Sequence, residues 1–381
     1  MGLAFLIYKY FPYGGLQRDF VRFVLELQRR GHDCRVYCTA WQGETLPAVE
    51  LRIAPAVAGS NVRRNEHFLQ WVQADLAAEP ADGVIGFNKM PGLDVYYAGD
   101  PCFIDTALRA RGPLYRLGWR FRHFAAWEKA VFDPAGSTQI LLLSPGERSK
   151  FERHYHTPPG RLHLLPPGVT PDRRRPPDAV ARRAAARHEL GLAHDVHTLL
   201  FVGSGFITKG LDRAIRALAT LQADHPGRKL RLLVAGQDRV GRFALQARRD
   251  QVQHQVIFLG GRDDIPDLML AADVLVHPAR SEAAGIVLLE ALVAGLPVVT
   301  TAACGYAHHI AAADGGLVLP EPFSQDALTS ALIRALDTGF LQQCRANGLA
   351  YAAREDLYSL HSAGADLVEQ TIRLKQDLVH A

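Results

Sequence analysis

Long apolar runs, signal-peptide features and paired cysteines are all missing from this chain. No stretch of about 18 uncharged apolar residues occurs anywhere, so no membrane-spanning helix is expected. Residues 1–7 are apolar but lack the basic region and cleavage site of a signal peptide, and we interpret them as a buried strand. The five cysteines form no C-x-x-C pair, which argues against zinc or dithiol redox chemistry. Any membrane contact must therefore be peripheral, and the cysteines are expected to be buried free thiols.

A dinucleotide fingerprint and a strong charge excess are missing as well. No G-x-G-x-x-G opens either strand–helix–strand series, so a nicotinamide-dependent dehydrogenase is not favoured. The net charge is only +4, so the places where basic residues cluster matter more than the total. What the chain does have is a 48% hydrophobic fraction over 381 residues, which is typical of a globular α/β protein with two domains.

Strands and helices alternate along two separate series. In the first, a strand at 3–8 is followed by a glycine turn, a helix at 16–30 and a second strand at 33–38. In the second, a strand at 198–203 precedes a helix near 211–221. Four more strands follow, at 230–236, 255–259, 274–277 and 297–300. This alternation predicts two Rossmann-like parallel sheets, each covered on both faces by helices.

The Pro- and Arg-rich stretch that follows residue 164 divides the two series. We predict an N-terminal domain over 1–166 and a C-terminal domain over 167–351, with a last segment, 352–381, that crosses back onto the first domain. Ligands bind beyond the carboxyl ends of the strands in open parallel sheets. Two such domains facing a central cleft would suit an enzyme with two substrates.

The segment from Ser281 to Glu290 is the most informative one for chemistry. We expect a helix that starts near Ala284, which would put Glu282 and Glu290 about two turns apart on one face. Backbone N–H groups at a helix start favour negatively charged ligands. The alternative is that Glu282 caps the helix and Glu290 faces solvent. Glu290 lies in the apolar run 286–296, where an unpaired charge is costly, and this favours a ligand-binding role.

This Glu-x₇-Glu pattern resembles the retaining glycosyltransferases of the GT-B fold. Residues 8–19, 86–96 and 304–310 resemble, more closely, the WaaG-like lipopolysaccharide core glucosyltransferases, and the similarity runs nearly end to end. The resemblance implies transfer of glucose from UDP-glucose, in α1,3 linkage, to an inner-core heptose on lipid A. The alternatives are another UDP-hexose, such as galactose or GalNAc, and a non-catalytic nucleotide-sugar-binding membrane scaffold.

The same resemblance assigns the donor site to the second domain. Glu282 and the backbone would hold the sugar and pyrophosphate, Glu290 would accept the ribose hydroxyls, and Lys209 would approach the pyrophosphate. Arg173 and Arg262 are further donor-site cations, although Arg173 to Arg175 could instead be a solvated linker. The backbone positions are Ala283, Ala284, Gly285 and Ile286.

Four residues of the first domain complete the predicted site. Gly14 and Gly15 would admit the donor phosphate because glycine has no side chain, although a plain turn is the alternative. Asp19 is a candidate acceptor or sugar contact, or simply pairs with the helix dipole. Asp100 stands where many relatives carry a histidine that contacts the donor sugar. We assign Asp19, Asp100, Lys209 and Glu282 to catalysis.

Neither a metal nor another cofactor is expected. Asp263 and Asp264 could bind Mg²⁺ with a phosphate, but we interpret them as caps of a helix at 265–270. In the family that the chain resembles, Lys, Arg and helix dipoles neutralise the diphosphate. The departing UDP oxygen would then assist deprotonation of the acceptor.

Residues 108–127 combine arginines with aromatic side chains and contain no acid. Such a composition favours the surface of an anionic membrane. The family resemblance implies that this surface is the cytosolic face of a Gram-negative inner membrane. The alternatives are a core helix with a basic face and nucleic-acid binding, and no recognised motif supports the latter. The proposed membrane contacts are Arg109, Arg111, Arg116, Trp119, Arg120, Phe121, Arg122, Phe124 and Trp127.

Overall fold

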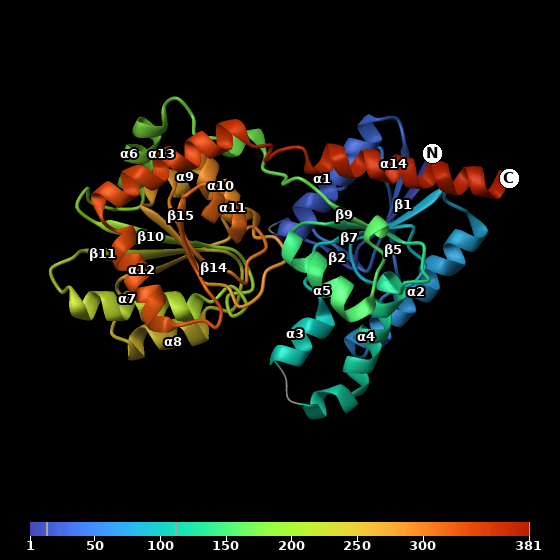
Figure 1. Ribbon diagram of the computed structural model, residues 1–381, viewed down its shortest axis with the longest axis horizontal. Helices are drawn as coiled ribbons and strands as arrows, with labels where there is room; N and C mark the ends of the chain where they lie inside the picture. Colours follow the sequence, from blue (N-terminus) through green and yellow to red (C-terminus); the bar gives the residue numbers. More distant parts are fainter. Residues whose placement is uncertain (13, 111–112, 381) are drawn as a thin grey trace. The chain divides into compact units, whose positions relative to one another are not determined.

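The computed structural model describes residues 1–12, 14–110 and 113–380, and they form two compact units (Figure 1). The first unit comprises Met1–Pro166 together with the segment from Ser359 onward, and the second comprises Pro167–Tyr358. The returning segment was expected to start at residue 352. Residues 352–354 instead form the end of helix α13 (Thr338–Arg354), which belongs to the second unit.

The first unit is built on a seven-stranded parallel sheet with the order β5-β3-β1-β6-β7-β8-β9. The first strand lies in the middle and the chain progresses outward on both sides, as in Rossmann folds. The strands are β1 (Gly2–Leu6), β3 (Asp33–Cys38), β5 (Glu50–Ile53), β6 (Gly83–Gly86), β7 (Val95–Ala98), β8 (Gln139–Leu142) and β9 (Leu162–Leu164), and β2 (Lys9–Tyr10) pairs with β4 (Ala40–Trp41) beside them.

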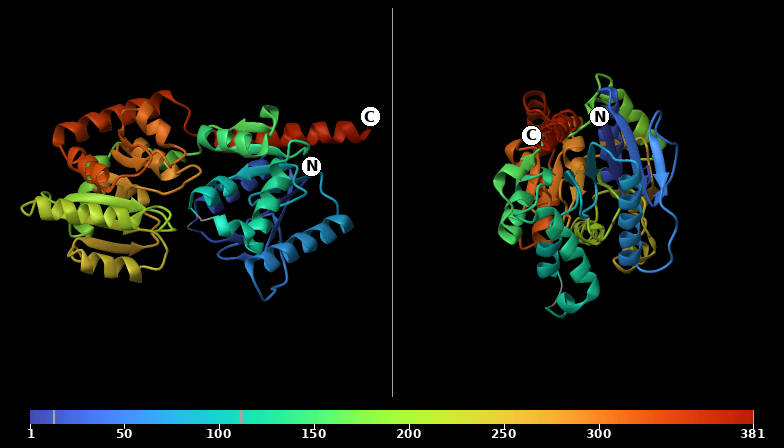
Figure 2. Two further views of the ribbon diagram at one scale, coloured as in Figure 1. Left: turned by 60° about the horizontal axis from the view of Figure 1, so that its bottom comes forward. Right: turned by 90° about the vertical axis from the view of Figure 1, so that its right-hand side faces the viewer.

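Helices cover this sheet, and their apolar faces explain where they pack. Helix α1 buries Phe20, Phe23, Val24 and Leu27, at helical spacing, on one side. The last helix, α14, lies beside α1, so the chain ends on the domain in which it began (Figures 1 and 2). The helices are α1 (Gly15–Arg29), α2 (Asn61–Ala78), α3 (Phe103–Ala110), α4 (Trp119–Phe132), α5 (Pro145–Tyr155) and α14 (Leu360–His380), with short 3₁₀ turns η1 (Pro113–Leu117) and η2 (Pro159–Arg161).

The second unit contains a six-stranded parallel sheet with the order β12-β11-β10-β13-β14-β15. The order again reverses at the first strand, which places a ligand-binding edge at the carboxyl ends of β10 and β13. The strands are β10 (His197–Val202), β11 (Leu230–Ala235), β12 (Val256–Gly260), β13 (Val274–His277), β14 (Val298–Thr301) and β15 (Gly316–Leu319). Both predicted parallel sheets are thus confirmed.

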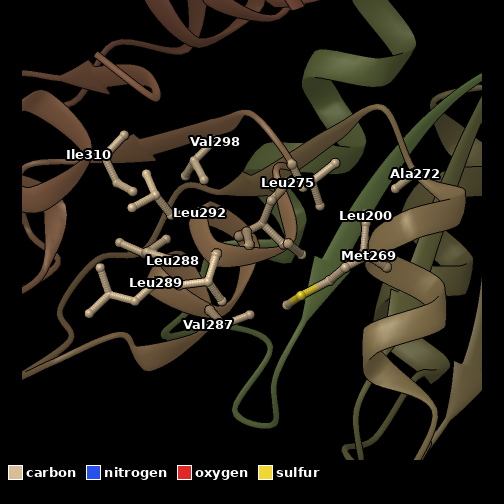
Figure 3. Close-up of a cluster of buried hydrophobic side chains, with 14 of the residues drawn as sticks. Leu200, Met269, Ala272, Leu275, Val287, Leu288, Leu289, Leu292, Val298 and Ile310 are labelled. Atoms are coloured by element: carbon tan, nitrogen blue, oxygen red, sulfur yellow. The ribbon is translucent and has the colours of Figure 1, made fainter. Parts of the chain in front are cut away.

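Helix α10 (Ile286–Ala294) lies inside the core of the second unit rather than on its surface. Every residue from Val287 to Ala294 is buried, and the helix packs with Leu275, Val298 and Ile310 (Figure 3). A helix that is apolar on all sides belongs in a core. The remaining helices are η3 (Pro171–Arg173), α6 (Ala179–Glu189), α7 (Leu211–Asp224), α8 (Gly241–Arg249), α9 (Ile265–Ala271), α11 (Ala307–Ala312), α12 (Gln325–Ala335) and α13.

The five cysteines are buried free thiols, as predicted. Burial raises the pKa of each of them, so their thiolate forms are disfavoured.

Candidate active site

Lys209, Glu282 and His277 meet at the carboxyl ends of β10 and β13. The Lys209 ammonium forms an ion pair with the Glu282 carboxylate, and Nε2 of His277 lies 3.4 Å from Oε2 of the same carboxylate. The side chains of Lys209 and Glu282 are each 20% exposed, whereas the His277 side chain is fully buried. The structure therefore brings together two residues that the sequence assigned to the site.

The electrostatics of this cluster keep Glu282 ionised. Burial alone would raise the pKa of Glu282, but the His277 hydrogen bond and the Lys209 charge outweigh it and lower the pKa to about 2. Burial also lowers the pKa of His277, so its imidazole is neutral at neutral pH. A neutral imidazole with its proton on Nε2 donates to Glu282.

Two glycines allow the β10–α7 loop to aim Lys209 at this point. Gly203 has φ +133°, and a Cβ there would lie 2.7 Å from Cδ of Lys209, so the lysine side chain runs directly over the glycine. Gly210 has φ +79°, and a Cβ there would lie 2.1 Å from the carbonyl oxygen of Pro278. In the loop after β13, the backbone N–H of Arg280 donates to the carbonyl of Thr208, in the loop after β10, over 2.7 Å. The loops after β10 and β13 are thus held against each other.

Arg173 and Glu290 form a second buried pair. Nε of Arg173 lies 3.6 Å from Oε1 of Glu290, and the two side chains are 10% and 6% exposed. Nε and Nη1 of Arg173 are buried and donate no hydrogen bond to any described residue. A buried cation with unused donors is costly unless a ligand accepts them. The alternative in which Glu290 faces solvent is therefore wrong.

The solvated-linker interpretation of residues 173–175 is also wrong. Arg173 is buried, Arg174 stacks over the ring of Tyr358 at 4.1 Å, and Arg175 donates to the carbonyl of Ala294 over 3.2 Å. These arginines attach the start of the second unit to its core.

Helix α10 begins later than predicted, so Glu282 is not on it. The helix starts at Ile286 after the left-handed N-cap Gly285, which leaves Glu282 in the preceding loop and Glu290 inside the helix. The two carboxylates therefore do not share a helical face. Residues 282–284 stay outside the helix because Glu282 exchanges backbone hydrogen bonds with Ala303 and Gly305, and the carbonyl of Ala284 accepts one from Tyr306. The first amides of α10 have no intrahelical acceptor and are available to an anion.

The predicted donor cation Arg262 pairs with Asp264 through two hydrogen bonds of 2.7 and 2.5 Å. Asp264 occupies the N-cap position of α9, as expected, but its side chain makes no capping hydrogen bond to the helix. The arginine competes successfully for the carboxylate because both of its N–H groups match both oxygens. In the described part of the chain, no three His, Cys, Asp or Glu residues are grouped closely enough to hold a metal ion.

The candidates in the first unit follow strands β1 and β7. Gly15 begins α1, and no atom lies within 4 Å of where its Cβ would be, so its backbone is open to approach, unlike that of Gly14, which Gln17 covers. Asp19 accepts a hydrogen bond of 2.9 Å from Tyr97 and lies 3.5 Å from Nε2 of His361. Asp100 lies exposed just beyond the end of β7.

The helices α3 and α4 form an arm that projects from the first unit (Figures 1 and 2). Its most exposed apolar side chains are Leu114, Leu117 and Trp119, at 79%, 66% and 60%, and Arg116, Arg120 and Arg122 beside them are also exposed. The sequence analysis did not single out the two leucines. None of the helices described is long and apolar enough to cross a membrane.

Trp127 was wrongly assigned to the membrane surface. Its ring is only 9% exposed and packs in the core, 4.5 Å from the ring of His123. Phe121 and Phe124 are half-buried against Phe103, with ring centroids 5.7 Å apart in both cases. Arg111 lies outside the described residues, and the structure does not describe the side chain of Arg109.

Comparisons with known proteins agree with this architecture. Residues 13–173 match the model of Glycosyltransferase Family 4, and residues 182–355 match that of Glycosyl transferases group 1. Anabaena HepE in complex with UDP-glucose, 18% identical, has the same fold with a TM-score of 0.73, over 97% of this chain and 100% of its own. The fold and the two models define a glycosyltransferase of the GT-B fold.

A full-length relative narrows this class. Lipopolysaccharide glucosyltransferase WaaG of Escherichia coli K12 is 47% identical over 369 residues, which cover 97% of this chain and 98% of the relative. A crystal structure of WaaG superimposes with a TM-score of 0.92 at 46% identity, over 96% of this chain and 99% of that one. The chain therefore belongs to the WaaG family of lipopolysaccharide glycosyltransferases.

Proposed function

We propose that this protein transfers glucose from UDP-glucose, in α1,3 linkage and with retention of configuration, to a heptose of the lipopolysaccharide inner core on lipid A. The observation that carries the proposal is that Lys209 with Glu282, and Arg173 with Glu290, form two ion pairs in the second unit, the first partly buried and the second more deeply buried. The similarity to a lipopolysaccharide glucosyltransferase over nearly the whole chain supports the choice of sugar and acceptor.

In this proposal each donor-site residue has one task. The ammonium of Lys209 and the unused N–H groups of Arg173 neutralise the diphosphate, together with the first amides of α10. Glu282 accepts from the sugar hydroxyls and Glu290 from the ribose. These groups are fixed before the donor binds, and preorganised charges of this kind contribute most to such catalysis.

Two carboxylates of the first unit, Asp19 and Asp100, are proposed to contact the acceptor or the transferred sugar. No protein base is required, because the departing UDP oxygen takes the acceptor proton on the same face of the sugar. No metal is required either, because basic side chains and helix amides are available to neutralise UDP.

The test combines donor binding with transfer. Thermal shifts should be measured with UDP-glucose, UDP-galactose, UDP-GalNAc and UDP alone, since a ligand bound only by the folded state raises its stability. We expect UDP-glucose to give the largest shift and to label a lipid A–core acceptor that ends in heptose. A larger thermal shift and faster transfer with another UDP-hexose would show that this sugar nucleotide, and not UDP-glucose, is the donor. Binding without transfer or hydrolysis would favour the non-catalytic scaffold.

We also propose that the α3–α4 arm binds the anionic cytosolic face of the inner membrane, where the lipid acceptor is made. The exposed apolar side chains Leu114, Leu117 and Trp119 alternate with the exposed cations Arg116 and Arg120. Apolar insertion and charge attraction are the two contributions that stable peripheral attachment needs. No nucleic-acid partner is proposed.

A further inference from the structure

The carboxylate of Glu128, on α4, is fully buried and accepts four strong hydrogen bonds. Its donors are Nζ of Lys89 at 2.6 Å, the hydroxyl of Tyr155 at 2.6 Å, and the amides of Phe103 and Ile104 at 2.7 and 3.0 Å. These contacts join the loop after β6, the start of α3 and helix α5 at one side chain.

Charged side chains hold every residue of the segment 101–104. Nζ of Lys89 also donates to the carbonyl of Pro101 over 2.7 Å, and the buried Glu147 accepts from the amide of Cys102 over 2.7 Å. With the two bonds to Glu128, four consecutive residues are each fixed by a charged group from elsewhere in the chain. This segment begins immediately after Asp100.

Such an arrangement exceeds what the start of a helix requires. A single serine or aspartate at the N-cap, exposed to water, satisfies a helix start at little cost. Burying two carboxylates and a lysine is far more expensive, and such groups persist where one exact conformation is needed. What they fix here is the backbone beside Asp100, at the carboxyl edge of the sheet.

Asp100 is close enough to this network to interact with it electrostatically. Burial raises the pKa of Tyr8 and Tyr96, and the negative charge of Asp100 raises both further. The buried hydroxyls of these tyrosines donate no hydrogen bond to any described residue. Desolvation by the surrounding protein raises the pKa of the Asp100 carboxyl; the charge of Lys89 opposes this rise and that of Glu128 adds to it.

We propose that Lys89, Glu128 and Glu147 are positioning residues that fix Asp100 for the transfer reaction. The inference rests on the proposed function, in which Asp100 contacts the acceptor or the transferred sugar. The competing interpretation is that the network only anchors the α3–α4 arm. The two differ in one respect: positioning acts through Asp100, whereas anchoring does not.

The test is a double-mutant cycle with Lys89→Met/Glu128→Gln and Asp100→Asn. Changing the lysine and the glutamate together removes both charges, so no lone charge is left buried. The matched control is Arg148→Met/Glu152→Gln, which removes a half-exposed ion pair of 3.0 Å from α5 without touching residues 101–104. For each variant, kcat and KM for both substrates are measured alongside Tm.

We expect the pair variant to lower kcat at least about tenfold with the donor KM unchanged, since small displacements of a reacting group are costly. In the Asp100→Asn background, itself slower than wild type, the same change should cause no further loss, because coupled residues are not additive. Three results would each overturn the proposal. The pair variant could lower kcat equally in the wild-type and Asp100→Asn backgrounds, or its kcat could equal that of the control variant. Asp100→Asn could also leave kcat unchanged. If the pair variant does not fold, Glu147→Gln, which weakens the bond to the amide of Cys102 and removes the ion pair with Lys150, is taken through the same cycle. A wild type without transferase activity would instead refute the proposed function.

Discussion

Replacing Glu282 with glutamine should impair catalysis and stability together, and the stability effect should depend on pH. Glu282→Gln keeps the size of the side chain but removes the charge that pairs with Lys209 and accepts from His277. We expect turnover to fall about 10²-fold or more, as the loss of one key electrostatic contact typically does.

The structure also gives the size of the stability effect. The pKa of Glu282 is lowered from 4.5 to about 2. That lowering corresponds to about 3 kcal/mol, at about 1.4 kcal/mol per pKa unit. Because one-fifth of the side chain is exposed and therefore screened, we expect about 2 kcal/mol to be measured. The folded-state pKa lies below the unfolded one, so this stability is present above pH 4.5 and is lost as the pH falls toward 2.

Urea unfolding of wild type and variant at neutral pH and at about pH 3 measures this effect. The difference in unfolding free energy between wild type and variant should be less than half as large at about pH 3 as at neutral pH. The matched control is Asp195→Asn, which breaks an exposed ion pair of 2.6 Å with Lys229 in the same unit and should change little. A gap that stays constant with pH would refute the electrostatic argument, and near-normal turnover would remove Glu282 from the site.

Three further outcomes are expected. Arg173→Met should weaken UDP binding about tenfold or more in thermal-shift titrations, since the diphosphate loses the charged N–H donors of the guanidinium. Turnover should survive EDTA, because no step of the proposed mechanism uses a divalent cation. Arg116→Gln/Arg120→Gln should reduce co-sedimentation with anionic vesicles roughly 30-fold, at about 1 kcal/mol per basic residue. Wild-type binding should also fall as salt rises, leaving a residual apolar attachment.

Each of these expectations has a control and a contrary result. The control for Arg173→Met is Arg216→Met, which changes an exposed arginine of α7 in the same unit. If this control bound UDP as weakly as the Arg173 variant, the loss of affinity would be a non-specific effect of charge. Activity abolished by EDTA and restored by Mg²⁺ or Mn²⁺ would require a metal site. Trp127→Phe, in the core, should leave vesicle binding intact. If the wild type bound neutral and anionic vesicles equally, or bound neither, the proposal that the α3–α4 arm binds an anionic membrane would be refuted.

Much of the fold could be predicted because its determinants are local. The strand predicted at 198–203 is β10 (His197–Val202), and the helix predicted near 211–221 is α7 (Leu211–Asp224). The start of α10 was missed for a non-local reason. Alanines at 283 and 284 favour a helix by propensity, but backbone bonds from Glu282 and Ala284 to residues 303–306 keep this segment out of the helix.

The candidate site was predictable in part. A carboxylate inside an apolar run indicated that Glu290 needs a partner, but nothing near it in the sequence identified Arg173 as that partner. His277 was missed, although a histidine that ends a strand of valine and leucine is a signal of a buried polar role. Glu128 looks like an ordinary surface residue of a helix, and only its contacts with distant loops reveal its burial.

The protonation states of the cluster bear on how the acceptor loses its proton. A carboxylate with a pKa of about 2 is ionised at neutral pH and too weak a base to hold an acceptor proton, so Glu282 is suited to accepting hydrogen bonds from the donor sugar. His277 is neutral, but its Nε2 proton is committed to Glu282 and its ring is buried. The Lys209 side chain is engaged in the ion pair with Glu282. In the second unit this cluster therefore offers charge and orientation rather than a base, which supports the proposal that the departing diphosphate oxygen receives the proton.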